Sequence, residues 1–189
     1  FVVPPIYDDS YYGFRIHEIA EMQVANMGNY AHGNQPAQHM IYLYNWAGQP
    51  WKTQKWVREV MDRLYSATPD GYCGDEDNGQ TSAWYVFSAL GFYPVCPATD
   101  QYILGTPLFK KVEVTMPGGK LLRISAPDNG KENFYISEMK VNGKRYTRTY
   151  LEHNLLTKGA DIRYTMSDQP SKNRSVSMED RPYSFSNER

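Results

Sequence analysis

The sequence predicts a mixed α and β chain, with helices in residues 1–95 and a β-rich segment in residues 96–189. In the first part, apolar residues recur at helical spacing between glycine and proline breaks. In the second part, short β-branched and aromatic runs are separated by Gly118-Gly119 and Asn142-Gly143, which are strong hairpin signals. We therefore expect a helical portion followed by a small antiparallel β unit.

Four helices are predicted after an extended, loop-like stretch over residues 1–13. Gly28 ends the first, Pro36 suits the first turn of the second, and Gly91 stops the fourth. The third carries an apolar stripe, which is more typical of a core than of a binding surface. The predicted helices cover residues 14–27, 37–46, 51–64 and 81–90.

The second half alternates short strands with turns and has no catalytic cluster of its own. The predicted strands cover residues 101–104, 111–115, 121–126, 134–141, 146–151 and 161–166. From about residue 167 the chain is rich in Ser, Arg and Pro, so we expect a loosely ordered tail.

Composition narrows the class of protein. The net charge is −1 and no basic run is interleaved with aromatic residues, which argues against a nucleic-acid partner. No apolar run approaches the roughly 20 residues that cross a bilayer. Phe1 in place of Met suggests a piece of a longer chain, or a processed one. Cys73 and Cys96 could pair if the protein is exported, but two buried thiols fit slightly better.

The most informative stretch is an acidic loop, residues 74–79, in which Asp75, Glu76 and Asp77 stand in a row between glycines. Two carboxylates on one side of a loop cannot both ionise freely, so one becomes a candidate general base or cation ligand. The alternative is a helix cap, in which Asp77 or Asn78 accepts hydrogen bonds from the first free amides of the next helix. Capping alone does not require three acids, and both interpretations stay open from the residues alone.

Two further groups of polar residues precede the acidic loop. Glu18 and Glu21 lie one helical turn apart with His17, as on a solvated helix face. A polar loop, residues 30–36, presents His32, Asn34 and Gln35, which suit ligand contact as well as capping. If short links connect helices that alternate up and down, alternate loops meet at one end of the bundle. The polar loop and the acidic loop could then face one pocket.

Three segments together resemble the C-terminal part of bacterial glycoside hydrolase family 92: residues 14–18, residues 32–36 and residues 74–94. Members of that family are calcium-dependent, exo-acting α-mannosidases, commonly α-1,2, that invert the anomeric centre. The resemblance implies an N-terminal β-sandwich followed by an (α/α)6 toroid. Residues up to about 95 would be the last helices of the toroid, and residues 96–189 the C-terminal β unit packed against it.

The resemblance also implies catalytic roles. Asp75 and Asp77 match the aspartates of the family on the base side, with Asp77 as the general base and Asp75 assisting. An inverting glycosidase also needs a carboxylic acid on the other face of the sugar. The general acid of the family is a glutamate in a motif that is absent here, so it is expected in the remaining N-terminal part of the protein.

Binding roles follow in the same way. His17 and Glu18 would contact the terminal mannose, in place of a solvated helix face, and His32 and Asn34 are further candidates for substrate binding. A calcium ion, which prefers oxygen ligands, would be held by Glu21, Asn34 and Gln35. Many members of the family carry Glu where this chain has Gln35, a difference that removes one charge.

The expected partners are a mannose-containing glycan and the N-terminal part of the same protein. The family implies export to the periplasm or cell surface of a bacterium. An alternative is a non-catalytic carbohydrate-binding or structural module, because the 16 Tyr and 4 Trp residues can stack on sugars.

Overall fold

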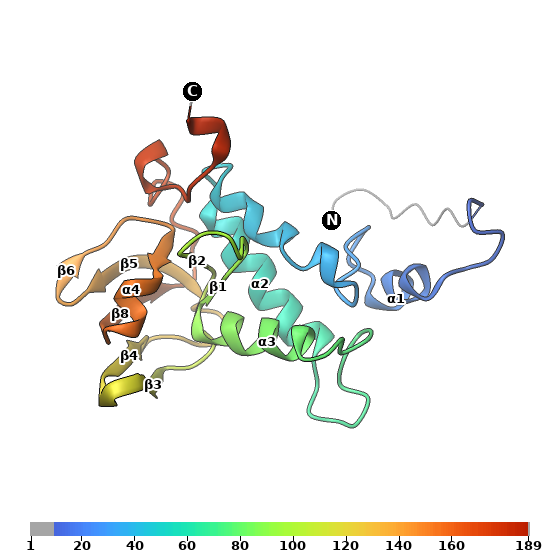
Figure 1. Ribbon diagram of the computed structural model, residues 1–189, viewed down its shortest axis with the longest axis horizontal. Coiled ribbons are helices and arrows are strands. Elements are labelled where there is room, and N and C mark those ends of the chain that lie inside the picture. The colour runs from blue at the N-terminus through green and yellow to red at the C-terminus, as the bar shows by residue number, and fades with distance from the viewer. Residues whose placement is uncertain (1–9, 189) are drawn as a thin grey trace. The chain divides into compact units, whose positions relative to one another are not determined.

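The computed structural model describes residues 10–188 and divides the chain into two compact units (Figure 1). The first unit holds residues 10–40 and 59–85, and the second holds residues 41–58 and 86–188. The mixed α and β class is confirmed. The predicted boundary near residue 95 differs from this division, because residues 41–58 and 86–95 pack with the β part.

The second unit contains two sheets. A three-stranded sheet has the order β1-β2-β7, and a five-stranded sheet has the order β3-β4-β8-β5-β6. The strands are β1 Phe92–Tyr93, β2 Gln101–Leu104, β3 Lys111–Thr115, β4 Leu121–Ser125, β5 Tyr135–Val141, β6 Lys144–Arg145, β7 Tyr150–Glu152 and β8 Asp161–Ser167. The prediction of a purely antiparallel unit is wrong for one pair, since β4 and β8 run parallel.

Both predicted hairpin turns are present. Asn142 and Gly143 have φ angles of 50° and 79°, the two left-handed residues that a type I′ turn requires between β5 and β6. Gly118 and Gly119, with φ angles of 79° and 76°, connect β3 to β4. Glycine and asparagine adopt this region at low cost, which explains why the two turns could be predicted here.

Residues 41–58 belong to the second unit because their buried polar side chains form hydrogen bonds with backbone and side-chain groups of the β part. Asn45 donates to the carbonyl of Leu104 at 2.9 Å, and the amide of Ile136 donates to the side chain of Gln54 at 3.0 Å. Arg58 donates to the side chain of Asn129 at 3.0 Å. A buried polar group without a partner costs free energy, so these contacts fix the segment on the β part.

The predicted loose tail is instead anchored. The carbonyl of Asp180 accepts hydrogen bonds from the backbone amide and the hydroxyl of Thr149, at 2.7 and 2.9 Å. Arg181 donates to the carbonyl of Trp46 at 3.1 Å, and the amide of Tyr183 donates to the side chain of Gln101 at 2.8 Å. Composition suggested disorder, but backbone groups of the second unit give this segment specific partners.

Three of the four predicted helices are present, the first of them shortened, whereas the second predicted helix is replaced by 3₁₀ segments and α4 was not predicted. The α-helices are α1 His17–Ala25, α2 Pro50–Leu64, α3 Gln80–Leu90 and α4 His153–Thr157, and the 3₁₀ segments are η1 Gln35–Ala37, η2 Met40–Asn45, η3 Pro117–Gly119, η4 Met178–Asp180 and η5 Phe185–Asn187. The helix predicted over 37–46 is therefore two short 3₁₀ segments with i to i+3 bonds, such as Trp46 N–H to the carbonyl of Leu43. Within residues 10–188, no helix has the length and apolar character needed to cross a bilayer.

α1 is shorter than predicted and mostly exposed. Asn26 takes a left-handed φ of 48° and ends the helix two residues before Gly28. Only Ile19 is buried, whereas Phe14 and Val24 are 68% and 89% exposed. Most of the predicted extended stretch 1–13 lies outside the described residues.

Candidate active site

The acidic loop uses its middle acid, and not the outer two, to cap α3. The Glu76 carboxylate accepts from the amide of Gly79 at 2.7 Å and from the hydroxyl and amide of Ser82 at 2.7 and 3.3 Å. The hydrogen bond from the Ser82 hydroxyl, followed by that from Gly79, lowers the pKa of Glu76 below its ordinary value. The capping role that the sequence suggested for Asp77 or Asn78 therefore belongs to Glu76.

Asp77 stands in an uncommon backbone conformation. Asp77, Asn78 and Gly79 have successive φ angles of 52°, 57° and 96°, all left-handed. Asp and Asn tolerate this region better than other non-glycine residues, yet such conformations still cost of order 1–3 kcal/mol each and gather at functional sites. The turn leaves Asp77 exposed, and its carboxylate makes no hydrogen bond or ion pair with any residue of 10–188.

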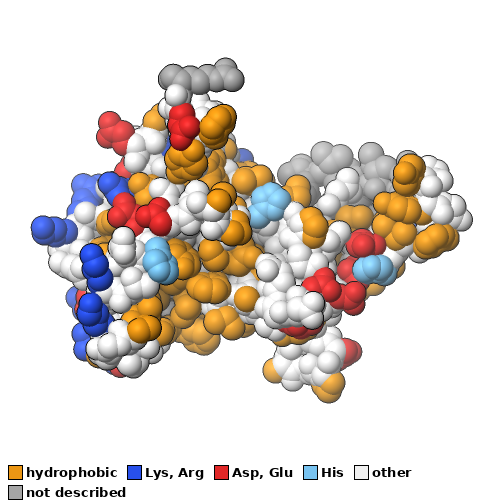
Figure 2. All heavy atoms as spheres, viewed as in Figure 1, with side chains coloured by type: hydrophobic (Ala, Val, Ile, Leu, Met, Phe, Trp, Pro, Cys, Tyr) orange, Lys and Arg blue, Asp and Glu red, His pale blue; other side chains and the backbone are white. Residues whose placement is uncertain are grey.

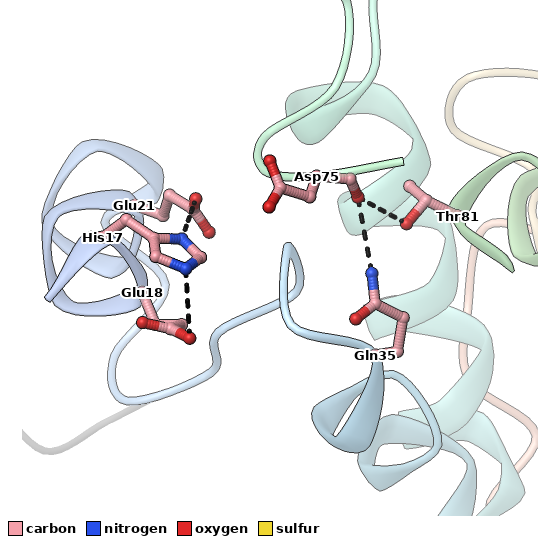
Figure 3. A network of polar contacts seen from close by, with 6 residues as sticks. All are labelled: His17, Glu18, Glu21, Gln35, Asp75 and Thr81. Carbon is pink, nitrogen blue, oxygen red and sulfur yellow. Dashed lines mark hydrogen bonds and ion pairs between the residues drawn. The ribbon is translucent and has the colours of Figure 1, made fainter. Parts of the chain in front are cut away.

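Asp75 differs from Asp77 in that its backbone is fixed while its carboxylate stays free. The carbonyl of Asp75 accepts from the Thr81 hydroxyl at 3.0 Å and from the Gln35 amide at 3.4 Å. Figure 3 shows the Asp75 carboxylate pointing away from Thr81, on the side that faces His17 and Glu21. Both outer carboxylates of the loop are thus available as proton acceptors.

The polar side of α1 is organised by His17. Its Nδ1 lies 3.0 Å from Glu21 Oε1, and its Nε2 lies 3.3 Å from Glu18 Oε1 (Figure 3). The hydrogen bond to Glu21 raises the pKa of His17 above its ordinary value, and the charges of Glu18, Glu21 and Asp75 act in the same direction. The two glutamates predicted on this helix are therefore held together through one exposed imidazole.

The second oxygen of Glu21 is buried and has no hydrogen-bond partner among residues 10–188. Gly33 and Gly74 form a cradle around it. A Cβ on Gly33 would lie 2.5 Å from Glu21 Oε2, and a Cβ on Gly74 would lie 2.7 Å from the same oxygen. Only glycine fits at either position, so the polar loop and the acidic loop meet against this carboxylate. Buried polar atoms in folded proteins are nearly always hydrogen-bonded, so this oxygen is a candidate position for a bound water or ion.

The polar loop places Gln35 against the acidic loop. Because Gln35 Nε2 donates to the carbonyl of Asp75, its Oε1 is directed away from that carbonyl. Asn34 is half-buried, and its side-chain amide makes no hydrogen bond with another residue of the described range. The structure thus brings together Glu21, Gln35 and Asp75, with Asn34 adjoining Gln35 in sequence.

His32, which was predicted to bind substrate, is buried inside the first unit. It is 1% exposed, and both ring nitrogens lie 2.7 Å from tyrosine hydroxyls, those of Tyr30 and Tyr65. Its ring packs on Trp84 with centroids 4.3 Å apart. Burial lowers the pKa of His32 to about 3. His32 therefore holds the polar loop from within the first unit, and the prediction that it touches a sugar does not fit its burial.

This burial predicts a pH dependence of stability. The unfolded chain protonates His32 near its ordinary pKa of 6.5, but the folded protein resists protonation down to about pH 3. The free energy of unfolding contributed by this group is therefore complete above pH 6.5, and falls by up to about 1.4 kcal/mol per pH unit below it. Thermal melts between pH 7 and pH 4.5 should show this loss, and His32→Gln should flatten the slope. An equal slope in the variant would contradict the assignment.

The cleft beside Glu21 and Asp75 is also lined by residues that the sequence analysis did not assign to the site. This cleft of about 700 Å³ is lined by both Glu21 and Asp75, and by Arg63, Tyr65, Tyr72 and Cys73. Burial, followed by the charge of Glu21, raises the pKa of Cys73 to about 11, so this thiol stays protonated. Cys73 and Cys96 are free thiols, as favoured from the sequence, but the prediction that both are buried is wrong, since Cys73 is half-buried and Cys96 is exposed.

Charge on the visible surface is unevenly distributed within each unit. Figure 2 shows acidic side chains and a histidine gathered around α1 and the neighbouring loops, and basic side chains gathered over the five-stranded sheet. Among residues 10–188, no three His, Cys, Asp or Glu side chains form a metal-binding cluster. A cation at this site would accordingly depend on amide or backbone oxygens beside Glu21.

Carboxylates that are free to take up or release a proton are the groups that glycoside hydrolases use in catalysis. Residues 8–168 match the Glycosyl hydrolase family 92 catalytic domain. The chain therefore belongs to glycosyl hydrolase family 92. It is also 29% identical, over 142 residues, to an uncharacterized secreted glycosidase of Arthroderma benhamiae, covering 74% of this chain and 18% of that protein.

Solved structures of the same family agree with this assignment. The chain is 55% identical to the family GH92 inverting mannosidase BT2199 of Bacteroides thetaiotaomicron, with a TM-score of 0.83 over 98% of this chain. It is 43% identical to the family GH92 α-mannosidase BT3965 of the same species, with a TM-score of 0.81 over 84% of this chain. The chain spans 25% and 22% of the lengths of these two structures.

Proposed function

We propose that this chain forms the base side of the active site in an exported, calcium-dependent exo-α-mannosidase that removes terminal, α-1,2-linked mannose with inversion. The proposal depends on one observation, that the three acids of the acidic loop have different hydrogen-bond partners. Glu76 caps α3 through three hydrogen bonds, which leaves the carboxylates of Asp75 and Asp77 without partners in the described residues. The family membership supplies the reaction class.

In this proposal Asp77 is the general base. An inverting enzyme activates water with a carboxylate on the face of the sugar opposite the leaving group. Asp77 is exposed, held in a defined turn and free to accept the proton of that water. Asp75, two residues away, assists by sharing the proton or orienting the water. The general acid comes from the N-terminal part of the protein, outside this chain.

His17 and Glu18 are proposed to bind the hydroxyls of the terminal mannose. The two side chains are 3.3 Å apart on α1, and His17 is exposed. Since Nδ1 and Nε2 of His17 face Glu21 and Glu18, a hydrogen bond from His17 to the sugar would replace one of these two contacts. Asn34, the other predicted substrate ligand, offers an amide without a partner among residues 10–188.

The residues present fit a calcium ion. Calcium prefers carboxylate and amide oxygens, and the unpartnered Oε2 of Glu21 lies in a cradle that a side chain would fill. We propose that Glu21, Asn34 and Gln35 hold the ion. When bound, it would supply positive charge that orients the sugar O2 and O3 hydroxyls. Gln35 can serve in place of a glutamate, since its Nε2 bonds the carbonyl of Asp75 while its Oε1 remains an acceptor.

Release of mannose from α-1,2-mannobiose tests the function. A protein that contains the complete catalytic domain should release mannose with calcium, stop with a chelator and recover when calcium is restored. The first product detected by NMR should be the β-anomer. This chain alone should release none, because it lacks the general acid. Binding of mannobiose without release by the complete protein would instead favour the carbohydrate-binding module.

A further inference from the structure

A buried chain of hydrogen bonds joins the polar loop to the acidic loop. Gln38 and Thr81 are 1% and 0% exposed. Gln38 Nε2 donates to the carbonyl of His32 at 3.3 Å and to the hydroxyl of Thr81 at 3.2 Å. The Thr81 hydroxyl in turn donates to the carbonyl of Asp75 at 3.0 Å. The path therefore runs from the backbone of one loop to the backbone of the other through two side chains.

The direction of each hydrogen bond is determined. The carbonyl of His32 can only accept, so Nε2 of Gln38 must face it, and Gln38 Oε1 then accepts from Gln80 Nε2 at 3.3 Å. The hydroxyl of Thr81 accepts from Gln38, which leaves its proton for Asp75. Trp84 Nε1 also donates to the carbonyl of Gln38 at 3.3 Å, and fixes that residue on α3. Buried networks in which each member is satisfied hold a single arrangement.

The carbonyl of Asp75 is where this chain meets the proposed site. It accepts from Thr81 and also from Gln35, the candidate cation ligand of the polar loop (Figure 3). Orientation of this carbonyl sets the peptide plane between Asp75 and Glu76, which constrains the backbone that carries the Asp75 carboxylate and the start of the turn that leads to Asp77. A shift of about 1 Å in such groups can reduce a rate about 100-fold.

We propose that Gln38 and Thr81 are positioning residues that couple the polar loop to the acidic loop. Through them, the position of Asn34 and Gln35 determines the position of the base carboxylates. This inference rests on the function proposed above. Because the link fixes the polar loop as well as the acidic loop, its loss should alter calcium affinity as well as turnover.

Thr81→Val tests the link, since valine keeps the shape of threonine and removes its hydroxyl. In a protein with the complete catalytic domain, we expect kcat to fall about 10-fold or more with KM little changed, because positioning is lost and sugar contacts remain. The calcium dissociation constant, measured by calorimetry without substrate, should rise several-fold. Thr81→Ser, which keeps the hydroxyl, should restore both quantities to within about threefold of the wild type.

Thr53 provides a matched control. Like Thr81, Thr53 is a fully buried threonine. It differs in that it lies in the second unit and its hydroxyl has no hydrogen-bond partner among residues 10–188. Thr53→Val should leave kcat and calcium affinity unchanged. If Thr81→Val lowers the melting temperature alone, with kcat and calcium affinity within twofold of the wild type, the coupling is refuted. If the valine variant does not fold, Thr81→Ala, which adds no bulk, replaces it in the comparison with serine.

Failure of the coupling can be told apart from failure of the function. A wild-type protein that releases no mannose in a calcium-dependent way contradicts the proposed function. A wild-type protein that does so, with an equally active Thr81→Val variant, contradicts the coupling alone.

Discussion

Asp77→Asn should lower kcat about 10²–10⁴-fold in a protein with the complete catalytic domain, the range expected for loss of a general base. Asparagine tolerates the left-handed φ of 52° as aspartate does, so the turn should persist. The amide cannot take a proton from water, whereas contacts to the sugar are unchanged, so KM should stay within a few-fold. Initial rates of mannose release measured as a function of pH test this effect. The fall in rate at acidic pH, which is caused by protonation of the base, should be absent in the variant.

The neighbouring residue supplies the control for this substitution. Asn78 has nearly the same backbone conformation, with a φ of 57°. Asn78→Asp adds one carboxylate to the same turn, at the neighbouring position, and so controls for the change of charge. It should change kcat by only a few-fold. Turnover above a tenth of the wild-type rate in Asp77→Asn would transfer the role of the base to Asp75.

Short-range signals in the sequence predicted much of the fold. β2 and β3 have the predicted bounds, because β-branched and aromatic residues stand between clear turn residues. Asn142-Gly143 forms its turn because the φ angles that the turn requires are those these residues adopt readily. In contrast, the parallel pairing of β4 with β8 depends on contacts between distant parts of the chain, which local propensity does not encode.

The candidate site shows the same limit. Asp75, Asp77 and Glu21 could be selected because acids between glycines, or one turn apart on a helix, form recognisable patterns. The roles of Glu76 and His32 could not be assigned from type alone. Glu76 became the cap because its longer side chain reaches Gly79 and Ser82, and His32 is buried because two tyrosine hydroxyls satisfy its ring. Gln38 and Thr81 act only through tertiary contacts, so nothing local distinguished them.

Glu21→Gln should weaken calcium binding about 10- to 100-fold or more, because calcium affinity follows the number of charged oxygen ligands. Glutamine has the same size, so it fits between Gly33 and Gly74 while removing the charge of the buried oxygen. Calorimetric titration of the substrate-free protein measures the affinity. The stabilisation of the protein by calcium in thermal melts should diminish in parallel.

Glu18→Gln is the matched control, since Glu18 lies on the same helix and also pairs with His17, at 3.3 Å. It should raise KM for mannobiose and leave calcium affinity within about threefold, because Glu18 is proposed to contact sugar and not the ion.

Gly33→Ala tests the cradle without any change of charge. Its Cβ would lie 2.5 Å from Glu21 Oε2 and 2.8 Å from both the Cys73 carbonyl oxygen and Gly74 Cα, so the carboxylate and the acidic loop must both shift and calcium affinity should fall. The opposite result, in which Glu18→Gln weakens calcium binding and Glu21→Gln does not, would make Glu18 the calcium ligand. The buried oxygen of Glu21 would then only stabilise the two loops.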